Sequence, residues 1–161
     1  MKSAGTLQAL IAICVTPAVT GVTAQKLAAQ DAPAPPDYIV TVRSAHAFDE
    51  TVDMLKSAIE EQNLMVIHEI NPQRMLRMVG VRTGGMRQIL FFHPRYMRQI
   101  LETDRNAGIE PPLKVLAMEA PDGSVMVRYV DPVYQFGRYT GLDEIAVELK
   151  AIVEAIVAVV Q

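Results

Sequence analysis

The stretch that decides the fold is LKVLAMEAPDGSVMVRY, residues 113–129. Its two ends, 113–118 and 125–129, are rich in valine, leucine, methionine and tyrosine, which is typical of strands. The residues PDG at 121–123 lie between them, and tight turns favour proline, aspartate and glycine. The two runs are therefore predicted to pair as an antiparallel hairpin.

Further strands and helices are predicted on both sides of this hairpin. Strands are expected where β-branched, aromatic or alternating apolar residues follow one another, at 38–42, 64–70 and 86–92. Apolar residues recur every three to four positions over 49–62 and over 142–160, which indicates two amphipathic helices, the second capped by Thr140.

Two shorter helices are predicted from prolines at their first turns. Asn71-Pro72 combines an N-cap residue with a proline whose missing N–H costs nothing at this position. Pro94 is expected to open a short helix over 94–101 in the same way.

Together these elements predict an α+β domain of two layers. A mainly antiparallel sheet of about five strands is expected to be packed by the first helix and by the long C-terminal helix. The strand at 115–118 is apolar on both faces, but a single helical layer covers only one of them. The other face is expected to meet a second copy of the chain, so a homo-oligomer (a dimer or a higher assembly) is predicted.

The N-terminus has the parts of a secretory signal peptide. Lys2 supplies a positive start, residues 7–15 are mostly apolar, and VTA at 22–24 provides the small residues that a signal peptidase recognises. Cleavage is expected after Ala24. The protein is therefore predicted to be periplasmic or secreted, with no membrane span after signal cleavage.

The rest of the chain is expected to form a tether and one domain. Residues 25–37 are rich in alanine, proline and glutamine and predict a flexible tether, followed by a single domain at 38–161. The only cysteine, Cys14, lies in the leader (1–24), which excludes disulfides and thiolate metal sites from the exported protein. No HExxH, P-loop, EF-hand or dinucleotide-binding motif occurs, so an enzyme is the less favoured hypothesis.

Positive charge is concentrated in one segment. From Arg74 to Arg105 there are seven arginines and two acidic residues, although the whole chain has a formal charge of −3. Solvated faces and local ion pairs explain such a segment, but arginine also binds planar anions through paired donors. Nucleic acid is not expected as a partner of an exported protein.

Three histidines are candidates for binding chemistry. His46 precedes the first helix and is expected to be an exposed local cap. His68 alternates with two apolar residues, Leu64 and Val66, and is therefore expected on an apolar face of its strand. His93 differs from both, because it ends a strand and is followed by arginine, tyrosine and methionine.

The setting of His93 suits two kinds of ligand. A strand-end histidine among aromatic residues and arginines suits an axial ligand of haem, with the arginines near the propionates. It equally suits copper, since thioethers select Cu(I) and the sulfur is offered by Met86, by Met97, or by Met75 and Met78. The alternative is that the methionines fill the core and that His93 is a hydrogen-bonded edge residue. Without a Cys-x-x-Cys-His motif, haem b would be held non-covalently.

A second segment is expected to help enclose the ligand. YQFGRY at 134–139 lies between the last strand and the last helix, and its aromatic residues favour either a pocket mouth or an oligomer contact. This segment is expected to be a loop near His93. The predicted ligand site comprises Phe91, His93, Arg95, Tyr96, Met97, Arg98, Tyr134 and Phe136; the predicted metal ligands are His93, Met97 and Met86.

From 48 to 132 the order of motifs resembles that of the domain of unknown function 302 family of small bacterial α+β domains. The resembling stretches are FDETV at 48–52, INP at 70–72, AGIEPPLKVL at 107–116, DG at 122–123 and DP at 131–132. The resemblance implies a two-layer α+β domain that often associates as a dimer or a higher oligomer, with no established general enzymatic activity.

The chain differs from this family at two motifs. INP at 70–72 stands where many members have IDH, and FHP at 92–94 stands where many have GNP. One histidine is thus absent and another, His93, is present, so a ligand role shared with the family is not implied.

The preferred interpretation is an exported, non-catalytic binding or accessory domain in an envelope redox context. It is expected to bind haem b or another apolar anionic ligand around His93, with a redox protein of the envelope as partner. The competing hypotheses are a structural homo-oligomerisation module without a small ligand, and a copper-binding protein that uses methionine and histidine.

Overall fold

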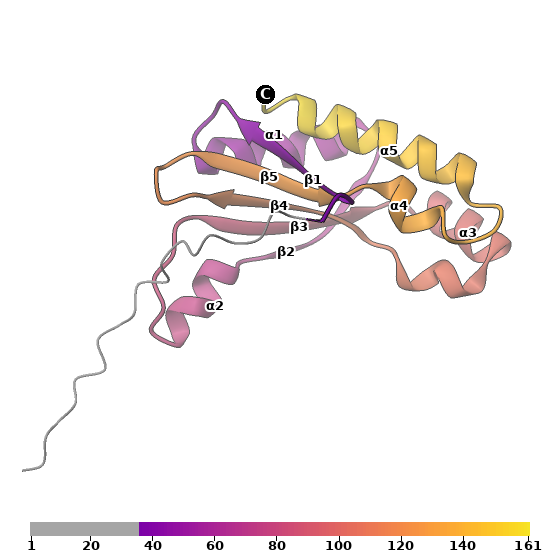
Figure 1. Ribbon diagram of the computed structural model, residues 1–161, viewed down its shortest axis with the longest axis horizontal. Helices are drawn as coiled ribbons and strands as arrows, with labels where there is room; N and C mark the ends of the chain where they lie inside the picture. Colours follow the sequence, from indigo (N-terminus) through magenta and orange to yellow (C-terminus); the bar gives the residue numbers. More distant parts are fainter. Residues whose placement is uncertain (1–35) are drawn as a thin grey trace, which may run out of the picture.

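The computed structural model describes residues 36–161, so the expected signal peptide (1–24) and residues 25–35 of the expected tether lie outside the described residues. The described chain forms one sheet with the strand order β1-β5-β4-β3-β2, in which all neighbouring strands are antiparallel (Figure 1). The strands are β1 (Ile39–Ser44), β2 (Met65–Ile70), β3 (Met86–Phe92), β4 (Leu113–Glu119) and β5 (Val125–Val130). The predicted hairpin is present as β4 and β5.

Two long helices, α1 (Phe48–Glu61) and α5 (Asp143–Ala158), lie together over one face of the sheet (Figure 1). The shorter helical segments are α2 (Pro72–Met78), α3 (Pro94–Thr103), the 3-10 helix η1 (Arg105–Ile109) and α4 (Pro132–Phe136). This arrangement confirms the predicted α+β fold, with its antiparallel sheet, first helix and C-terminal helix. Among the helices of residues 36–161, none has the length and apolar character needed to cross a bilayer.

The hydrophobic core lies between the sheet and these two helices. Leu55 of α1 and Leu149 of α5 are fully buried, as are Val115 of β4 and Val127 of β5. Full burial of such an aliphatic side chain stabilises the fold by about 1.5–3 kcal/mol. The alternation of apolar residues in the strands and their spacing of three to four in the helices therefore hold the two layers together.

Three of the helices begin at a proline that follows a capping side chain. Asn71 Oδ1 accepts a hydrogen bond from the N–H of Arg74 at 2.8 Å, which confirms the predicted cap of α2. His93 caps α3, and Asp131 Oδ1 accepts from the N–H of Val133 at 2.8 Å to cap α4. A polar residue followed by proline therefore starts each of these helices.

The segment between β5 and α5 differs from the prediction. A loop was expected at 134–139, but α4 continues to Phe136. The predicted N-cap Thr140 is also wrong, because Leu142 occupies that position without a side-chain hydrogen bond. Gly141 has a φ of 83°, which glycine adopts at little cost, and this turn delays the start of the helix to Asp143.

β2 contains a bulge that changes which side chains face the core. Val66 lies opposite Phe91 and His68 lies opposite Leu90, which leaves Ile67 without a partner of its own. An extra residue reverses the alternation of the side chains beyond it. His68 is therefore exposed, which corrects the prediction that it faces the apolar side.

The second face of the sheet is more open than the first. In β4, Val115 and Ala117 face α1 and the core, so Leu116 and Met118 face the opposite side, where they are only partly buried. α2 contacts β3 and lies on this side of the sheet (Figure 1). A second copy of the chain on this face stays a prediction.

Candidate functional site

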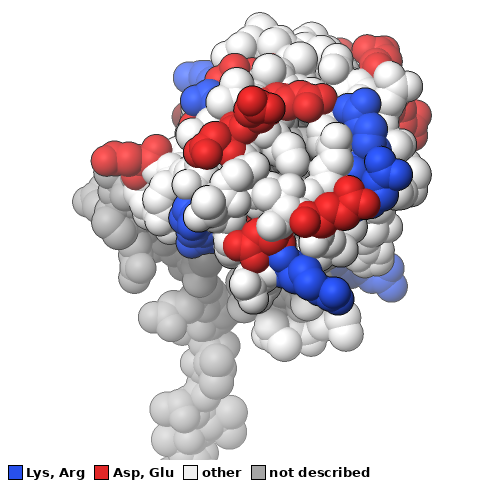
Figure 2. Space-filling model, turned by 90° about the vertical axis from the view of Figure 1, so that its right-hand side faces the viewer, with Lys and Arg blue, Asp and Glu red and all other residues white. Residues whose placement is uncertain are grey.

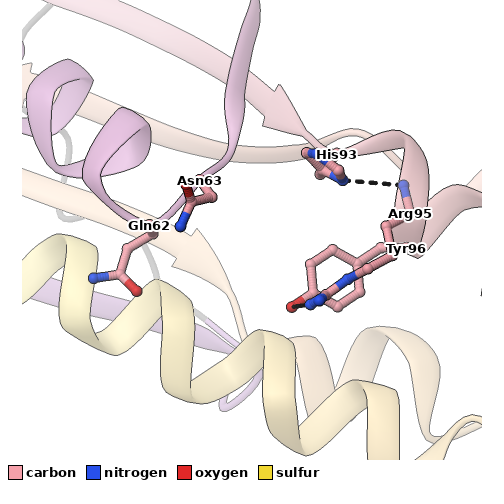
Figure 3. Close-up of a pocket in the computed structure, with 5 residues that line it drawn as sticks. All are labelled: Gln62, Asn63, His93, Arg95 and Tyr96. Carbon is pink, nitrogen blue, oxygen red and sulfur yellow. Dashed lines mark hydrogen bonds between the residues drawn. The ribbon is translucent and has the colours of Figure 1, made fainter.

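A shallow cleft adjoins His93. It lies where the C-terminal end of α1 approaches the start of α3, and its volume is about 150 Å³. Gln62, Asn63, His93, Arg95 and Tyr96 line it (Figure 3). The structure thus brings together three of the predicted site residues, His93, Arg95 and Tyr96. It also places two amide side chains in the cleft lining that were not predicted from the sequence.

The end of α1 supplies the amide side of the cleft. Gln62 is the C-cap residue, and its N–H donates to the carbonyl oxygen of Ala58 at 3.1 Å. Asn63 then takes a left-handed conformation with a φ of 55°, which asparagine tolerates better than most residues. Two exposed amide side chains, each with donors and an acceptor, therefore follow one another beside the cleft.

The ring of His93 is bonded to the start of α3. Its Nδ1 accepts a hydrogen bond from the backbone N–H of Arg95 at 3.0 Å, drawn as the dashed line in Figure 3. A neutral imidazole whose Nδ1 is an acceptor has its proton on Nε2. The remaining ring nitrogen of His93 is therefore a donor, and this arrangement leaves no lone pair for a metal ion.

Tyr96 connects the cleft to α5. Its hydroxyl donates to Glu148 Oε1 at 2.5 Å and accepts from Arg95 Nη2 at 2.7 Å. Arg95 Nη2 also lies 3.1 Å from the same Glu148 oxygen. Burial of the phenol, together with its hydrogen bond to Glu148, raises the pKa of Tyr96 above the ordinary value. The three side chains form a polar bridge between α3 and α5.

Arginines at this end of the molecule are paired with acidic residues. Figure 2 shows this end, where positive and negative side chains lie beside one another. Arg98 Nε lies 3.7 Å from Glu102 Oε1, and Arg95 lies against Glu148. The arginines near His93 therefore do not form a patch of one sign, in contrast to the excess of arginine in this segment of the sequence.

Several predicted site residues lie away from the cleft lining. Phe91 and Phe136 are fully buried in the core, and Met97 is partly buried against that core. Arg98 is exposed and faces Glu102. Successive residues of a helix point in directions about 100° apart, so the run that follows Tyr96 does not share one face.

Met86 lies at the opposite end of β3 from His93. At about 3.3 Å per residue, the strand separates these two residues by about 23 Å. A single copper ion cannot bind both, so the copper hypothesis loses this pair of ligands. Within residues 36–161, no group of three or more histidine, cysteine, aspartate or glutamate side chains is placed to hold a metal ion.

The predicted aromatic segment belongs to a second polar cluster. The ring of Tyr134 stacks on that of Tyr38 with the ring centres 4.3 Å apart. Arg138 Nη2 and the Tyr139 hydroxyl both donate to Glu110 Oε1, at 2.8 Å and 2.6 Å. The hydrogen bond to Glu110 raises the pKa of Tyr139. These contacts hold α4 against the segment after η1, and neither Tyr134 nor Phe136 lines the His93 cleft.

Of the site residues that were not predicted, Asn63 has a signal in the sequence and Glu148 has none. Asparagine directly after an amphipathic helix is typical of a left-handed C-terminal cap, so Asn63 was open to prediction. Glu148 is separated from Tyr96 by 52 residues, and no local pattern links them. His46 is half-buried instead of exposed, and its Nδ1 lies 3.2 Å from Glu50 Oε1.

Comparison with known proteins identifies the family. A family model described as "Domain of unknown function DUF302" matches residues 40–160. This chain belongs to the DUF302 family. A crystal structure of an uncharacterized conserved DUF302 protein from Bacillus stearothermophilus matches the DUF302 domain described above with a TM-score of 0.72 and 17% identity, over 78% of this chain and 100% of that chain. The family and the fold expected from the sequence are confirmed.

Curated relatives of this DUF302 chain are longer proteins. "Fluoride-specific ion channel FluC 1" of Brucella suis is 25% identical over 102 residues, which cover 63% of this chain and 40% of that protein. "Fluoride-specific ion channel FluC 2" of Brucella melitensis is also 25% identical over 102 residues, which cover 63% of this chain and 38% of that protein. The chain thus spans about two fifths of the length of these relatives.

Proposed function

We propose that this DUF302 domain is a non-catalytic binding module whose cleft between α1 and α3 takes a small anionic group such as a carboxylate. The proposal rests on the hydrogen bond from the Arg95 N–H to His93 Nδ1, at 3.0 Å. This bond leaves Nε2–H as the donor of the ring, in a cleft that also has the amides of Gln62 and Asn63. No acidic residue lines the cleft, and donors of this kind favour an anion.

The volume of the cleft fits a small anionic group. Its volume is about 150 Å³, whereas pockets for drug-sized ligands have about 300–1,000 Å³. One carboxylate or a comparable anion fits this space. The apolar remainder of a larger ligand would lie outside the cleft, so an apolar anionic ligand is compatible with the proposal.

Haem binding remains a hypothesis from the sequence, and the geometry around His93 does not fit it well. Iron takes the lone pair of Nε2, which requires the ring proton on Nδ1. Nδ1 would then lose the hydrogen bond from Arg95 that caps α3. Met97 is not among the residues that line the cleft, so a second axial ligand from that side chain is not supported.

A homo-oligomerisation module is the second candidate function. It is favoured by Leu116 and Met118, which lie on the open face of the sheet and are only partly buried. A second copy packed on that face would remove this apolar surface from water. Sedimentation velocity over a range of protein concentrations tests it; a monomer at every concentration would exclude it.

We also infer that the protein is exported, which rests on the leader alone. Lys2, the apolar residues 7–15 and the small residues at 22–24 support it. Mass spectrometry of the protein from the periplasmic fraction is expected to find an N-terminus at Gln25. An N-terminus at Met1 in the cytoplasmic fraction would exclude export.

The binding proposal is tested by NMR titration of the labelled protein with sodium acetate. Addition of acetate is expected to shift the imidazole signals of His93 and the backbone amide signal of Arg95. His93→Asn is the informative variant, because asparagine is also a good N-cap but lacks the Nε2 donor. A hydrogen bond to a charged group contributes about 1.5–3 kcal/mol, so this variant is expected to bind acetate at least about tenfold more weakly.

His68→Asn is the matched control, since His68 is exposed on β2 outside the cleft lining. It is expected to bind acetate as the unaltered protein does. Equal affinities of the two variants would overturn the proposal. Sodium fluoride serves as a second probe because the curated relatives are named as fluoride channels. Hemin is the third probe: a Soret shift that is lost in His93→Ala would favour haem over a small anion.

A further inference from the structure

We propose that α2 and the loop that follows it form a docking surface for a membrane that contains anionic phospholipid. This surface, called the α2 patch below, consists of Arg74, Met75, Arg77, Met78, Val79 and Arg82. It lies outside the His93 cleft, and the inference is independent of the function proposed for that cleft.

The first observation is the exposure of apolar side chains on α2. None of the residues of α2 is buried. Met75 is 62% exposed, Met78 is 81% exposed and Val79, the C-cap residue, is 75% exposed. Their spacing of three and four residues places them on one face of the helix. A helix normally turns such a face toward the core, so this face is available for another apolar surface.

The second observation is the charge next to this apolar face. Arg74, Arg77 and Arg82 are exposed, and none of them forms an ion pair in the part of the chain that the structure describes. Arg87, by contrast, lies 3.1 Å from Glu69. The sequence contains no acidic residue from position 70 to position 101. The α2 patch therefore has three arginines that form no ion pair within the described residues, and Glu119, whose Oε2 accepts from the N–H of Gly85 at 2.9 Å, lies against the loop beyond them.

The third observation is a groove between α2 and the loop that returns to β3. It has a volume of about 330 Å³ and is lined by Gln73, Arg77, Val81, Arg82 and Thr83. Gln73 Nε2 donates to the carbonyl oxygen of Thr83 at 3.3 Å, which ties the loop to the helix. Two guanidinium groups thus line one groove, and planar guanidinium groups bind phosphate through paired donors.

The position of α2 makes the α2 patch accessible to a membrane. α2 lies on the side of the sheet opposite to α1 and α5 and projects from the domain (Figure 1). The arginines match the phosphates of anionic lipids, and their aliphatic stems allow methionine and valine to reach the acyl boundary.

A lipid surface fits the α2 patch better than a second copy of the chain does. A symmetric dimer through the patch would place arginines of one copy against those of the other, and like charges repel. The helix has seven residues, whereas a stable protein interface takes about 20–30 residues from each partner. Shallow insertion into a membrane needs only a few apolar and basic side chains.

Co-sedimentation of the purified protein with vesicles tests the inference. Vesicles of phosphatidylcholine mixed with phosphatidylglycerol are expected to bind the protein more tightly than vesicles of phosphatidylcholine alone. Each arginine near an anionic surface strengthens binding about fivefold, so Arg74→Gln/Arg77→Gln/Arg82→Gln is expected to weaken it roughly a hundredfold. Added salt is expected to weaken the binding of the unaltered protein as well.

The control removes three arginines from the opposite end of the domain. Arg98→Gln/Arg105→Gln/Arg138→Gln changes the net charge by the same amount but leaves the α2 patch intact. It is expected to bind the mixed vesicles within about threefold of the unaltered protein. Equal losses in the two triple variants would show that only net charge matters and would overturn the inference.

A fluorescent reporter tests the apolar part of the patch. The chain has no tryptophan, so Met78→Trp introduces a single reporter on α2. Its emission is expected to shift to the blue when mixed vesicles are added, because tryptophan enters the membrane interface. No shift with vesicles, or a response to inorganic phosphate without vesicle binding, would overturn membrane docking in favour of a soluble phosphate or a protein partner.

Discussion

Replacement of Tyr96 by phenylalanine removes one hydroxyl from the polar bridge between α3 and α5. The hydroxyl donates to Glu148 Oε1 at 2.5 Å and accepts from Arg95 at 2.7 Å, while the ring packs 6.2 Å from that of Phe92. Phenylalanine preserves the ring and leaves no cavity in the core. The variant therefore isolates the hydrogen bonds of the hydroxyl.

The size of the effect depends on the surroundings of the two charged partners. A hydrogen bond to a charged group contributes about 1.5–3 kcal/mol, and its removal costs the most where the partner is left buried and unsatisfied. Arg95 and Glu148 have side chains that are 57% and 50% exposed, so water and their own ion pair still satisfy them. We expect Tyr96→Phe to lower the free energy of unfolding by about 1–1.5 kcal/mol.

The pH dependence provides a second test of the same hydroxyl. Because folding raises the pKa of Tyr96, the folded protein keeps this proton at pH values where the unfolded chain loses it. The resulting stability is complete below the ordinary pKa of 10.0 and is lost as the pH rises through the raised value. Tyr129 and Tyr139 also have raised pKa values, so the variant is expected to lose only one part of this alkaline decline.

Urea unfolding followed by far-UV circular dichroism, at about pH 8 and about pH 11, measures both effects. Tyr134→Phe is the control, because Tyr134 is 50% exposed and its hydroxyl has no hydrogen bond within the described chain. A loss in Tyr96→Phe no larger than in Tyr134→Phe would refute the bridge. An alkaline decline identical to that of the unaltered protein would refute the assigned pKa direction.

Three further substitutions test the core, the second polar cluster and a helix cap. Leu149→Ala, at a fully buried position of α5, is expected to cost about 2–5 kcal/mol in urea unfolding, whereas Val147→Ala, 60% exposed on the same helix, is expected to stay within about 0.5 kcal/mol. Glu110→Gln is expected to lower the pKa of Tyr139, since the hydrogen bond to Glu110 is the main cause that raises it. An absorbance titration of the tyrosines that is unchanged from that of the unaltered protein would contradict this. Asp131→Ala is expected to cost about 1 kcal/mol more than Asp131→Asn, because asparagine keeps the cap on α4; equal losses in calorimetry would show that the ion pair with Lys150 dominates.

Element types and most boundaries were open to prediction because their signals are local. Runs of apolar, β-branched and aromatic residues predicted β3 and β4, and helical spacing predicted α1 and α5. The cap of α2 was predicted from Asn71-Pro72. Asp131-Pro132 has the same pattern of a capping residue followed by proline. This pattern predicts a helix that starts at Pro132, where the structure has α4, and not a loop at 134–139.

The errors arose where a single residue changes the backbone geometry of the residues after it. The bulge at Ile67 turned His68 from the expected core face to solvent. Gly141, with its positive φ, moved the start of α5 past Thr140. The bulge depends on the pairing of β2 with β3, which the sequence of β2 alone does not reveal. Gly141, by contrast, is a local signal, because glycine permits a positive φ.

The candidate site was foreseen only in part for a related reason. His93, Arg95 and Tyr96 adjoin in the sequence, and the start of α3 keeps them together. Met86 was predicted as a thioether ligand of copper and Phe91 as an aromatic neighbour of His93, but distance along β3 separates Met86 from the cleft and burial separates Phe91 from it. Contiguity in the sequence predicts a shared element, not a shared surface.

The amino-acid order alone determined the family, the antiparallel two-layer architecture and the helices that start at prolines, since periodicity and capping act over a few residues. Tertiary structure decided that Gln62 and Asn63 line one cleft with His93, that Glu148 joins Tyr96 across 52 residues, and that no residue of α2 is buried. These features depend on which surfaces meet when the helices pack on the sheet. These long-range contacts depend on the packing of the whole core, so no single segment of the sequence predicts them.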